Sequence, residues 1–365
     1  MVDISNIVKK LTCAWLSLTI IVFSFSVIHA DENVKGVFFL KNIIINGERI
    51  VNYNLQHPFF IYGDTTYFPL TPDMGDICGF DAEMDWQNRT LKLSKTETSL
   101  NNIRDNWIKT DGENIDAFFA NDILVTTEEE SGADGAPAAE PAEVIGLEEY
   151  NVFEEYNVFV RDDVIYLPLR VMTEHEDFKW DVYYDSYYGV CVSTVAGVPA
   201  AGFVPEPERR YNKGLVDYIN TKNNDYSVSR LQEMVFMFQR AAEVYNVNER
   251  LLMAMAEKES RFRSYAKSQS GALGLMQIMP RTGAAYGLTQ AQLMDMRISI
   301  NFGAKYISER LVNYGGDITK GLSAYNQGSG NVSRGSYSTR YASGVLNAKE
   351  SMEAYLTGNG YGLGE

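Results

Sequence analysis

The hydrophobic pattern of this chain changes its period once, near residue 200. From Val37 to about Val195, apolar residues come in short alternating or β-branched runs separated by Asn-Gly and Gly-Asp turn signals. From Tyr211 onward, they recur at the spacing of one helix face. The first spacing is typical of β-strands and the second of α-helices, so the two regions form different kinds of secondary structure. A chain of 365 residues is long enough to form two hydrophobic cores. We therefore predict an α+β multidomain fold, in which a mixed β-rich domain is followed by a mainly α domain.

Residues 1–30 are typical of an export signal. Lys9 and Lys10 precede a mostly apolar run from Leu11 to Ile28, and Ala30 ends a small-residue cleavage site. The run is also just long enough to cross a bilayer, so an uncleaved N-terminal anchor is the alternative. We predict an exported protein, extracellular, in the cell wall or at the outer face of the membrane, with wall or membrane association through its N-terminus.

The β-rich region contains an internal repeat. YGDTTYFPL, ending at Leu70, recurs as VRDDVIYLPL, ending at Leu169, and MDWQNRTLKLS (84–94) recurs as VYYDSYYGVCVS (182–193). Each copy reads as strand, turn, strand, short helix and strand pair, except that TPDMGDICGF in the first copy looks too irregular for a helix. The pattern resembles the copper-amine-oxidase N-terminal-like stalk domain, a non-catalytic module of exported proteins. The resemblance implies a stalk domain over 31–195, without a ligand set for copper.

Two connecting segments stand out by composition. Residues 126–144 (TTEEESGADGAPAAEPAEV) contain no aromatic residue and are rich in Ala, Glu, Pro and Gly, which predicts a flexible acidic loop inside the stalk domain. Residues 196–210 are rich in proline and small residues, which predicts a semi-extended spacer. We assign 196–228 as the linker between the two domains.

Charge and cysteine content exclude several classes of function. The net charge is -16, and nucleic-acid binding needs a basic face that this composition does not supply. Cys78 and Cys191 follow the leader, and two cysteines are too few for a disulfide scaffold; they pair with each other or remain two separate buried thiols. Three histidines and no Cys/His cluster predict no metal site and no cofactor.

The stretch from Leu251 to Pro280 carries the candidate chemistry. Asn248 is a suitable N-cap, and Glu259 continues the stripe of Leu251 and Met255 into the last turn of the predicted helix. Desolvation there disfavours a carboxylate and raises its pKa, as a general acid requires. The alternative is an ordinary helix-terminal glutamate that pairs with a neighbouring arginine.

Two further predictions concern the helices at this site. Glu257 lies about 200° from Glu259 around the helix, so we expect it to face water and to serve as a control. The preceding helix carries one apolar stripe from Leu231 to Tyr245, and Ser229 with Gln232 fits a capping box at its start.

Four motifs follow in order along the second half of the chain. They are ESRF (259–262), GALGLMQIMP (271–280), AYNQG (324–328) and TRYASGVL with its Tyr341, and NFGAKYISERL (301–311) lies between the second and the third. The series resembles the soluble-lytic-transglycosylase (SLT) domain, a lysozyme-like family, and covers 229–355, about a third of the chain. It implies a lysozyme-like domain over 229–356 followed by a tail at 357–365.

The resemblance implies a role for each motif residue. Glu259 is the catalytic acid, and Tyr341 donates a hydrogen bond that orients its carboxyl group. Substrate-binding roles fall on Ser260 at the helix end, Gly274 and Met276 along the groove, Gln277 with its amide, Tyr325 as a wall and Asn326 for an acetamido group or hydroxyl. Leu275 and Ile278 are expected in the core, and Gly328 is expected to permit a turn.

The predicted substrate is the glycan strand of peptidoglycan. A glycoside hydrolase normally uses two carboxylates, and these motifs supply only Glu259. We read Asp295, Glu309 and Asp317 as solvated or capping residues. The resemblance implies a lytic transglycosylase, in which one glutamate first protonates the oxygen between N-acetylmuramic acid (MurNAc) and N-acetylglucosamine (GlcNAc). It then acts as base for the muramyl 6-hydroxyl, which leaves a 1,6-anhydro end. The alternatives are a hydrolytic muramidase and a non-catalytic wall-binding protein.

Overall fold

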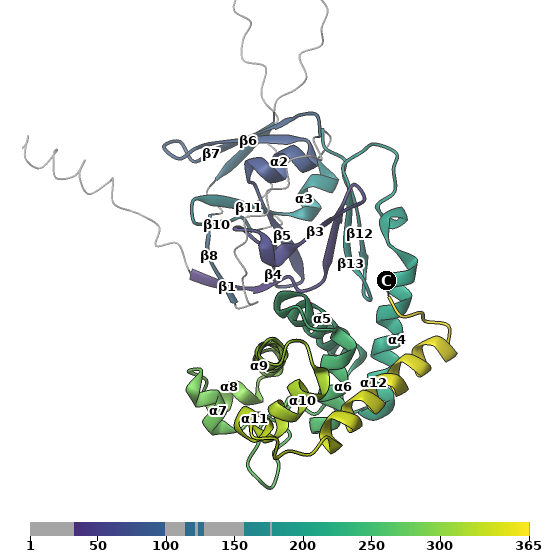
Figure 1. The fold of residues 1–365 in the computed structure, drawn as a ribbon. Helices are drawn as coiled ribbons and strands as arrows, with labels where there is room; N and C mark the ends of the chain where they lie inside the picture. The colour runs from purple at the N-terminus through teal and green to yellow at the C-terminus, as the bar shows by residue number, and fades with distance from the viewer. Residues whose placement is uncertain (1–32, 99–113, 121–122, 128–156, 176, 365) are drawn as a thin grey trace, which may run out of the picture.

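The computed structural model describes residues 33–98, 114–120, 123–127, 157–175 and 177–364. The predicted signal at 1–30 and most of the predicted acidic loop at 126–144 lie outside these residues. Strands occupy the N-terminal part and helices the C-terminal part, as the change of period predicts (Figure 1). We call residues 33–203 the β module and residues 206–364 the helical domain. No helix among the described residues is long and apolar enough to span a membrane.

A closed barrel forms the centre of the β module. Its strands, in spatial order, are β1 (Asn33–Phe38), β4 (Phe60–Tyr62), β5 (Thr65–Pro69), β11 (Val164–Pro168), β10 (Phe159–Arg161) and β8 (Asn114–Phe119). All six neighbouring pairs are antiparallel. Aromatic rings fill part of the barrel: Phe60 lies 5.3 Å from Tyr67 and 5.6 Å from Phe159, centroid to centroid. Such pairs stabilise a small core beyond their buried area.

Two further sheets show that the repeated halves exchange strands. One consists of β12 (Asp181–Asp185), β13 (Gly189–Ser193), β2 (Asn42–Ile45) and β3 (Glu48–Ile50), and the other of β6 (Phe80–Asp85), β7 (Thr90–Lys95) and β9 (Leu124–Thr127). The early strand β2 pairs in parallel with β13 of the second copy, and β9 pairs in parallel with β7 of the first. If the halves are taken as residues 33–98 and 114–193, each half therefore supplies one strand to a sheet of the other.

Short helices and turns of the β module follow local sequence rules. Helix α2 (Pro72–Cys78) begins after Thr71, whose side chain accepts from the backbone N–H of Met74, and ends at Gly79 with φ of 76°. The expectation that this stretch is irregular was wrong, because the Thr-Pro start and the glycine end specify a helix. Helix α3 (Leu169–Glu174) is its counterpart, and η1 (Asn52–Asn54) is a single 3-10 turn. Cys78 and Cys191 are separate buried thiols.

The helical domain packs around α6. Its helices are α4 (Glu206–Lys222), α5 (Val228–Tyr245), α6 (Glu249–Ser260), α7 (Pro280–Ala285), α8 (Gln290–Met294), α9 (Met296–Asn313), α10 (Ile318–Gln327), α11 (Ser329–Ser333) and α12 (Arg340–Gly358). Residues 251–256 of α6 are all buried, against α5 and α12. Helix α5 is capped by Ser227, whose hydroxyl accepts from the N–H of Arg230, and not by Ser229 as predicted. The true cap lies two residues earlier.

The predicted linker is structured. The 3-10 helix η4 (Ala200–Phe203) packs on β12 and β13, and α4 packs against α5 and α12 with Leu215 and Ile219 fully buried. Pro205 and Pro207 do not prevent this helix, because they lie at its start, where an N–H has no intrahelical partner. The predicted tail is packed too, since the hydroxyl of Tyr361 donates to Asp217 of α4 at 2.5 Å. The spacer and tail assignments were therefore wrong.

Helix α5 joins the two parts of the molecule, as Figure 1 shows. Its Glu243 pairs with Arg49 of the β module at 3.2 Å. The guanidinium group of Arg240 lies over the rings of Phe38 and Tyr53, at 5.0 and 5.8 Å from their centroids. Cation–π contacts of this kind gain strength when they are desolvated, and Arg240 is buried. The same helix packs on α6 and α9, so the β module contacts a helix of the core that holds the candidate site.

Candidate active site

The end of α6 places Glu259. The helix begins at the predicted cap, because the side chain of Asn248 accepts from the N–H of Leu251 at 3.0 Å. It ends where Arg261 adopts the left-handed conformation, with φ of 54°, and where the N–H of Arg261 bonds to the carbonyl of Glu257. Phe262 also has a positive φ and is fully buried. The chain therefore turns away immediately after the Glu259 turn, which leaves that carboxyl group at the C-terminal end of the helix.

The surroundings of Glu259 favour its protonated form. The side chain is half-buried, and burial raises its pKa to about 7. The hydroxyl of Tyr341 donates to its Oε1 at 2.7 Å, and this bond with the charge of Lys258 acts in the opposite direction, lowering the pKa. A helix C-terminus carries partial negative charge, which adds to the cost of a carboxylate there. The group can therefore hold a proton near neutral pH, as the sequence predicted.

No second carboxylate contributes to the pKa of Glu259 in the described part of the chain. Asp295 and Asp317 cap α9 and α10, accepting from the N–H groups of Ile298 and Lys320. Glu309 pairs with Arg310 at 2.8 Å. These contacts confirm the capping interpretation for the two aspartates. Within the described residues, no group of three or more His, Cys, Asp and Glu side chains could hold a metal ion.

Glu257 does not face open water, which corrects the expectation for this residue. Its side chain is 16% exposed, pairs with Lys222 at 2.9 Å and accepts from the hydroxyl of Tyr218 at 2.7 Å. Both partners lie on α4, the helix that was predicted as a linker. The helical rotation was right, but it could not reveal that another helix covers this face.

Tyr325 and Tyr341 both lie close to Glu259. Tyr325 donates from its hydroxyl to the carbonyl of Met276 at 2.9 Å, and burial, with the charge of Glu259 as the next cause, raises its pKa well above the usual value. Asn326 follows it on α10 and is exposed, so its amide is accessible to a ligand. Gly328 ends α10 with φ of 83°, which confirms the turn expected there.

The loop before α7 differs from the prediction in two residues. A Cβ on Gly274 would meet the carbonyl oxygen of Leu293 at 1.9 Å, so the protein's own backbone already requires a glycine at this position. Met276 has no exposed surface and packs against Gly303, so its side chain is in the core and cannot give apolar contact to a ligand. Leu275 and Ile278 are core residues, as expected.

Gln277 and Ser260 make contacts within the protein. The amide nitrogen of Gln277 donates to the carbonyls of Ala266 and Gly274, at 3.1 and 2.9 Å, and thereby closes the loop. Its amide oxygen is the part that can serve a ligand. Ser260 is buried and donates to the carbonyl of Ala256 one turn earlier, which fixes the helix end but keeps the hydroxyl away from the surface.

Sequence reasoning missed the residues that support Tyr325. The ring of Tyr306 packs edge-on against Tyr325 at 5.4 Å, and the guanidinium group of Arg310 lies 3.4 Å from the Tyr306 centroid. Ser299 accepts from the N–H of Met276 at 3.1 Å and holds the loop from the other side. The spacing of Tyr306 and Arg310, four residues apart on α9, was a signal that the two side chains share one face.

A family model described as "Transglycosylase SLT domain" matches residues 236–344, which include Glu259, the loop around Gln277, Tyr325 and Tyr341. Residues 236–344 are a transglycosylase SLT domain. The match begins within α5 and ends within α12, so the SLT domain is the larger part of the helical domain and does not include the β module.

Curated relatives resemble part of the chain. "Membrane-bound lytic murein transglycosylase C" of Serratia proteamaculans is 33% identical over 145 residues, which are 35% of this chain and 40% of the relative. "Peptidoglycan transglycosylase gp16" of Escherichia phage T7 is 37% identical over 101 residues, 26% of this chain and 8% of that protein. Among solved structures, the 70 kDa soluble lytic transglycosylase of Escherichia coli matches with a TM-score of 0.31 and 23% identity, over 44% of this chain and 34% of that one. The chain spans well under half the length of these relatives.

Proposed function

We propose that this protein is a peptidoglycan lytic transglycosylase that cleaves the bond between MurNAc and GlcNAc without water. The observation that carries the proposal is the state of Glu259, whose pKa of about 7 lets it hold a proton near neutral pH, while no other carboxylate of the described chain contributes to that pKa. The SLT domain and the lytic murein transglycosylase names of the curated relatives support the choice of substrate.

In the proposed reaction, Glu259 serves twice. Its protonated carboxyl group gives the proton to the glycosidic oxygen as the bond from that oxygen to C1 of MurNAc breaks. The 6-hydroxyl of the same MurNAc then attacks C1, and its proton returns to the Glu259 carboxylate. The products are a free GlcNAc 4-hydroxyl and a 1,6-anhydro-MurNAc end, and the enzyme regains its starting protonation state.

Neighbouring residues act on this carboxyl group and on the sugar. Tyr341 holds Oε1 through its hydroxyl and so leaves Oε2 for proton transfer. We assign the exposed amide of Asn326 and the amide oxygen of Gln277 to hydrogen bonds with the acetamido and hydroxyl groups of the glycan. Tyr325 positions the loop through the Met276 carbonyl.

The products of sacculus digestion test the proposal. In water labelled with oxygen-18, a transglycosylase yields muramyl ends one water lighter than reducing ends and without the label. A muramidase incorporates the label at each new reducing end, and that result would overturn the transglycosylase assignment. Glu259→Gln should give no products of either kind while still sedimenting with sacculi.

The β module is assigned a non-catalytic role, as the stalk resemblance implies. Neither Glu259 nor any residue proposed to contact the glycan belongs to it. We propose that it holds the SLT domain at the cell wall of an exported protein. A helical domain produced alone should then cleave soluble glycan fragments but digest intact sacculi more slowly, and equal rates on both substrates would contradict this role.

A further inference from the structure

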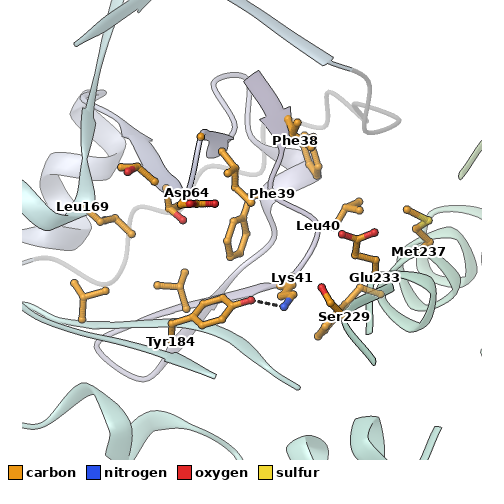
Figure 2. A pocket seen from close by; sticks show the side chains of 18 of the residues that line it. Phe38, Phe39, Leu40, Lys41, Asp64, Leu169, Tyr184, Ser229, Glu233 and Met237 are labelled. Carbon is orange, nitrogen blue, oxygen red and sulfur yellow. Dashed lines mark hydrogen bonds between the residues drawn. The ribbon is translucent and has the colours of Figure 1, made fainter. Parts of the chain in front are cut away.

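A groove lies between the β module and the helical domain. Its volume is about 1000 Å³, and it is bounded by the β1–β2 connection, the β4–β5 turn, α3, β12, the first half of α5 and the start of α9 (Figure 2). None of the residues assigned to the candidate active site lines it. Grooves between two parts of a protein are a common place for ligand binding.

The charged groups of this groove are unusual for so acidic a chain. Lys41, Arg170 and Arg297 line it, and none of these three forms an ion pair with a described residue. A fourth cation, Arg230, is neutralised by Glu233 at 2.5 Å. With Arg230 and Glu233 paired, these three cations exceed the two remaining carboxylates of the lining, Asp64 and Asp295, by one positive charge, in contrast with the net charge of -16 for the whole protein. The local excess favours an anionic ligand.

Besides Glu233, two acidic side chains line the groove, and they differ in their contacts. Asp295 accepts from the N–H of Ile298 at the start of α9. Asp64, in the exposed β4–β5 turn, makes no ion pair among the described residues, and Figure 2 shows it across the groove from the α5 residues. A ligand that satisfies this groove therefore carries several negative groups and one positive group.

The walls between these charges are apolar and aromatic. Phe39, Leu40 and Met237 line one part, and the ring of Tyr184, 53% exposed, projects from β12 (Figure 2). The amine of Lys41 donates to the Tyr184 hydroxyl and to the carbonyl of Ser186, and lies 4.8 Å from the Tyr184 ring centroid. An exposed ring held in place by a lysine is suited to packing against a peptide chain.

We propose that this groove binds the uncrosslinked stem peptide of peptidoglycan. The glycan backbone is uncharged, whereas such a peptide carries free carboxylates and the single amine of its diamino acid. The three cations would receive the carboxylates, Asp64 would receive the amine, and Tyr184 would pack against the chain between them. The choice of ligand rests on the proposed function, but the groove and its charges do not depend on Glu259.

This assignment gives the domain junction a function. A stem peptide is covalently attached to MurNAc, so a protein that grips both peptide and glycan gains affinity through effective concentration. The enzyme would then prefer strands with free stem peptides over strands whose peptides are crosslinked through the same amine.

Binding of a synthetic stem pentapeptide, with its N-terminal amine acetylated to mimic the amide link to MurNAc, to the full-length protein tests the proposal. Isothermal titration at low ionic strength should show that the double variant Arg170→Gln, Arg297→Gln binds at least tenfold more weakly, because two charge-assisted contacts are lost. The matched control is Lys179→Gln with Arg281→Gln, which removes the same charge from exposed positions that do not line the groove. The control should stay within twofold of the wild type. Equal weakening of both double variants would show non-specific attraction and would overturn the proposal.

The ligand's amine gives a second, independent readout. Acetylation of the diamino-acid side chain should weaken binding to the wild type several-fold. Asp64→Asn should bind the free and the acetylated peptide equally, because the contact is already absent. An unchanged preference for the free amine in Asp64→Asn would contradict the assignment of this residue.

Cleavage of peptide-free glycan separates this proposal from the proposed function. The Arg170→Gln, Arg297→Gln variant should cleave such glycan at the wild-type rate, and Glu259→Gln should bind the stem pentapeptide like the wild type while cleaving nothing. Cleavage without any peptide binding would overturn the groove assignment alone. Peptide binding without cleavage by the wild type would overturn only the catalytic proposal. Unchanged melting temperatures check that the groove variants are folded.

Discussion

The last turn of α6 presents two glutamates to two different regions of the molecule. Glu257 faces α4, where Lys222 and the Tyr218 hydroxyl hold its carboxylate. Glu259 faces α10 and α12, where Tyr341 supplies one hydroxyl and no cation forms an ion pair with it in the described chain. Both side chains are half-buried. The difference teaches that two glutamates of similar exposure on one helix turn can meet opposite surroundings, a cation for Glu257 and a hydroxyl group without a cation for Glu259.

The largest expected effect separates the two positions by activity. Glu259→Gln should lower kcat/KM on peptidoglycan at least about 1000-fold, because general acid–base catalysis typically contributes two to four orders of magnitude and no other described carboxylate can replace it. Glu257→Gln should retain activity within about threefold. A muropeptide-release assay on both variants measures the ratio. Similar losses for both would remove the distinction between the two faces.

The same substitution should stabilise the protein in a pH-dependent way. The pKa of Glu259 is raised from 4.5 to about 7, so the native state binds more protons than the unfolded state between these values. Wild-type stability therefore falls as pH rises through this window, and the neutral glutamine avoids the loss. At pH 8, Glu259→Gln should be about 3 kcal/mol more stable than the wild type, with little difference at pH 4. Denaturant titrations at both pH values check this, and a constant difference would refute the raised pKa.

Tyr341→Phe should have a smaller effect on the same face. The hydrogen bond from Tyr341 lowers the pKa of Glu259, so its loss should move the alkaline limb of the kcat/KM profile to higher pH. The maximum rate should also fall about tenfold, because the carboxyl group loses the contact that orients it, worth about 1.5 kcal/mol. A pH–rate profile separates the two results. A lower rate with an unmoved limb would mean that Tyr341 acts only through packing.

Glu257→Gln should have the smallest effect, and one confined to stability. Lys222 loses its ionic partner, whereas the Tyr218 hydroxyl can still donate to the amide oxygen of glutamine. We expect a loss of about 1 kcal/mol that decreases with added salt, as for a partly exposed ion pair. Thermal unfolding at low and high salt measures it. A stabilising substitution would show that the ion pair contributes nothing to the packing of α4 on α6.

Local patterns in the sequence predicted the elements whose signals are local. The N-cap at Asn248, the helix that carries Glu259 and the Asn46–Gly47 turn between β2 and β3 all follow from residues within one turn of each other. The contact between Tyr341 and Glu259 spans 82 positions and was expected only through family resemblance. The β repeat predicted the hairpins of each copy but not the exchange of β2 and β9, since strand pairing across halves leaves no mark within either half.

The errors at the site have one physical cause. Spacing gives the side on which a residue lies along a helix, but it does not give the folding of a loop. Gly274 packs against the backbone of Leu293, and the side chain of Met276 is buried against Gly303. No periodicity in GALGLMQIMP predicts this packing. Likewise, Lys222 is distant in sequence from Glu257. The ion pair between them depends on α4 being a helix, whereas the sequence predicted a linker there.

The exchange of β2 and β9 also determines how this protein can be divided. A fragment that contains one copy of the repeat would lack the strand that completes its sheet and would expose a hydrogen-bonding edge. Two such fragments, cut within 99–113 so that β9 is separated from β7 and β2 from β13, and produced together, should therefore reassemble into one stable particle without a peptide link. Co-purification of an untagged half with a tagged one would demonstrate this complementation, and independent folding of each half would exclude it.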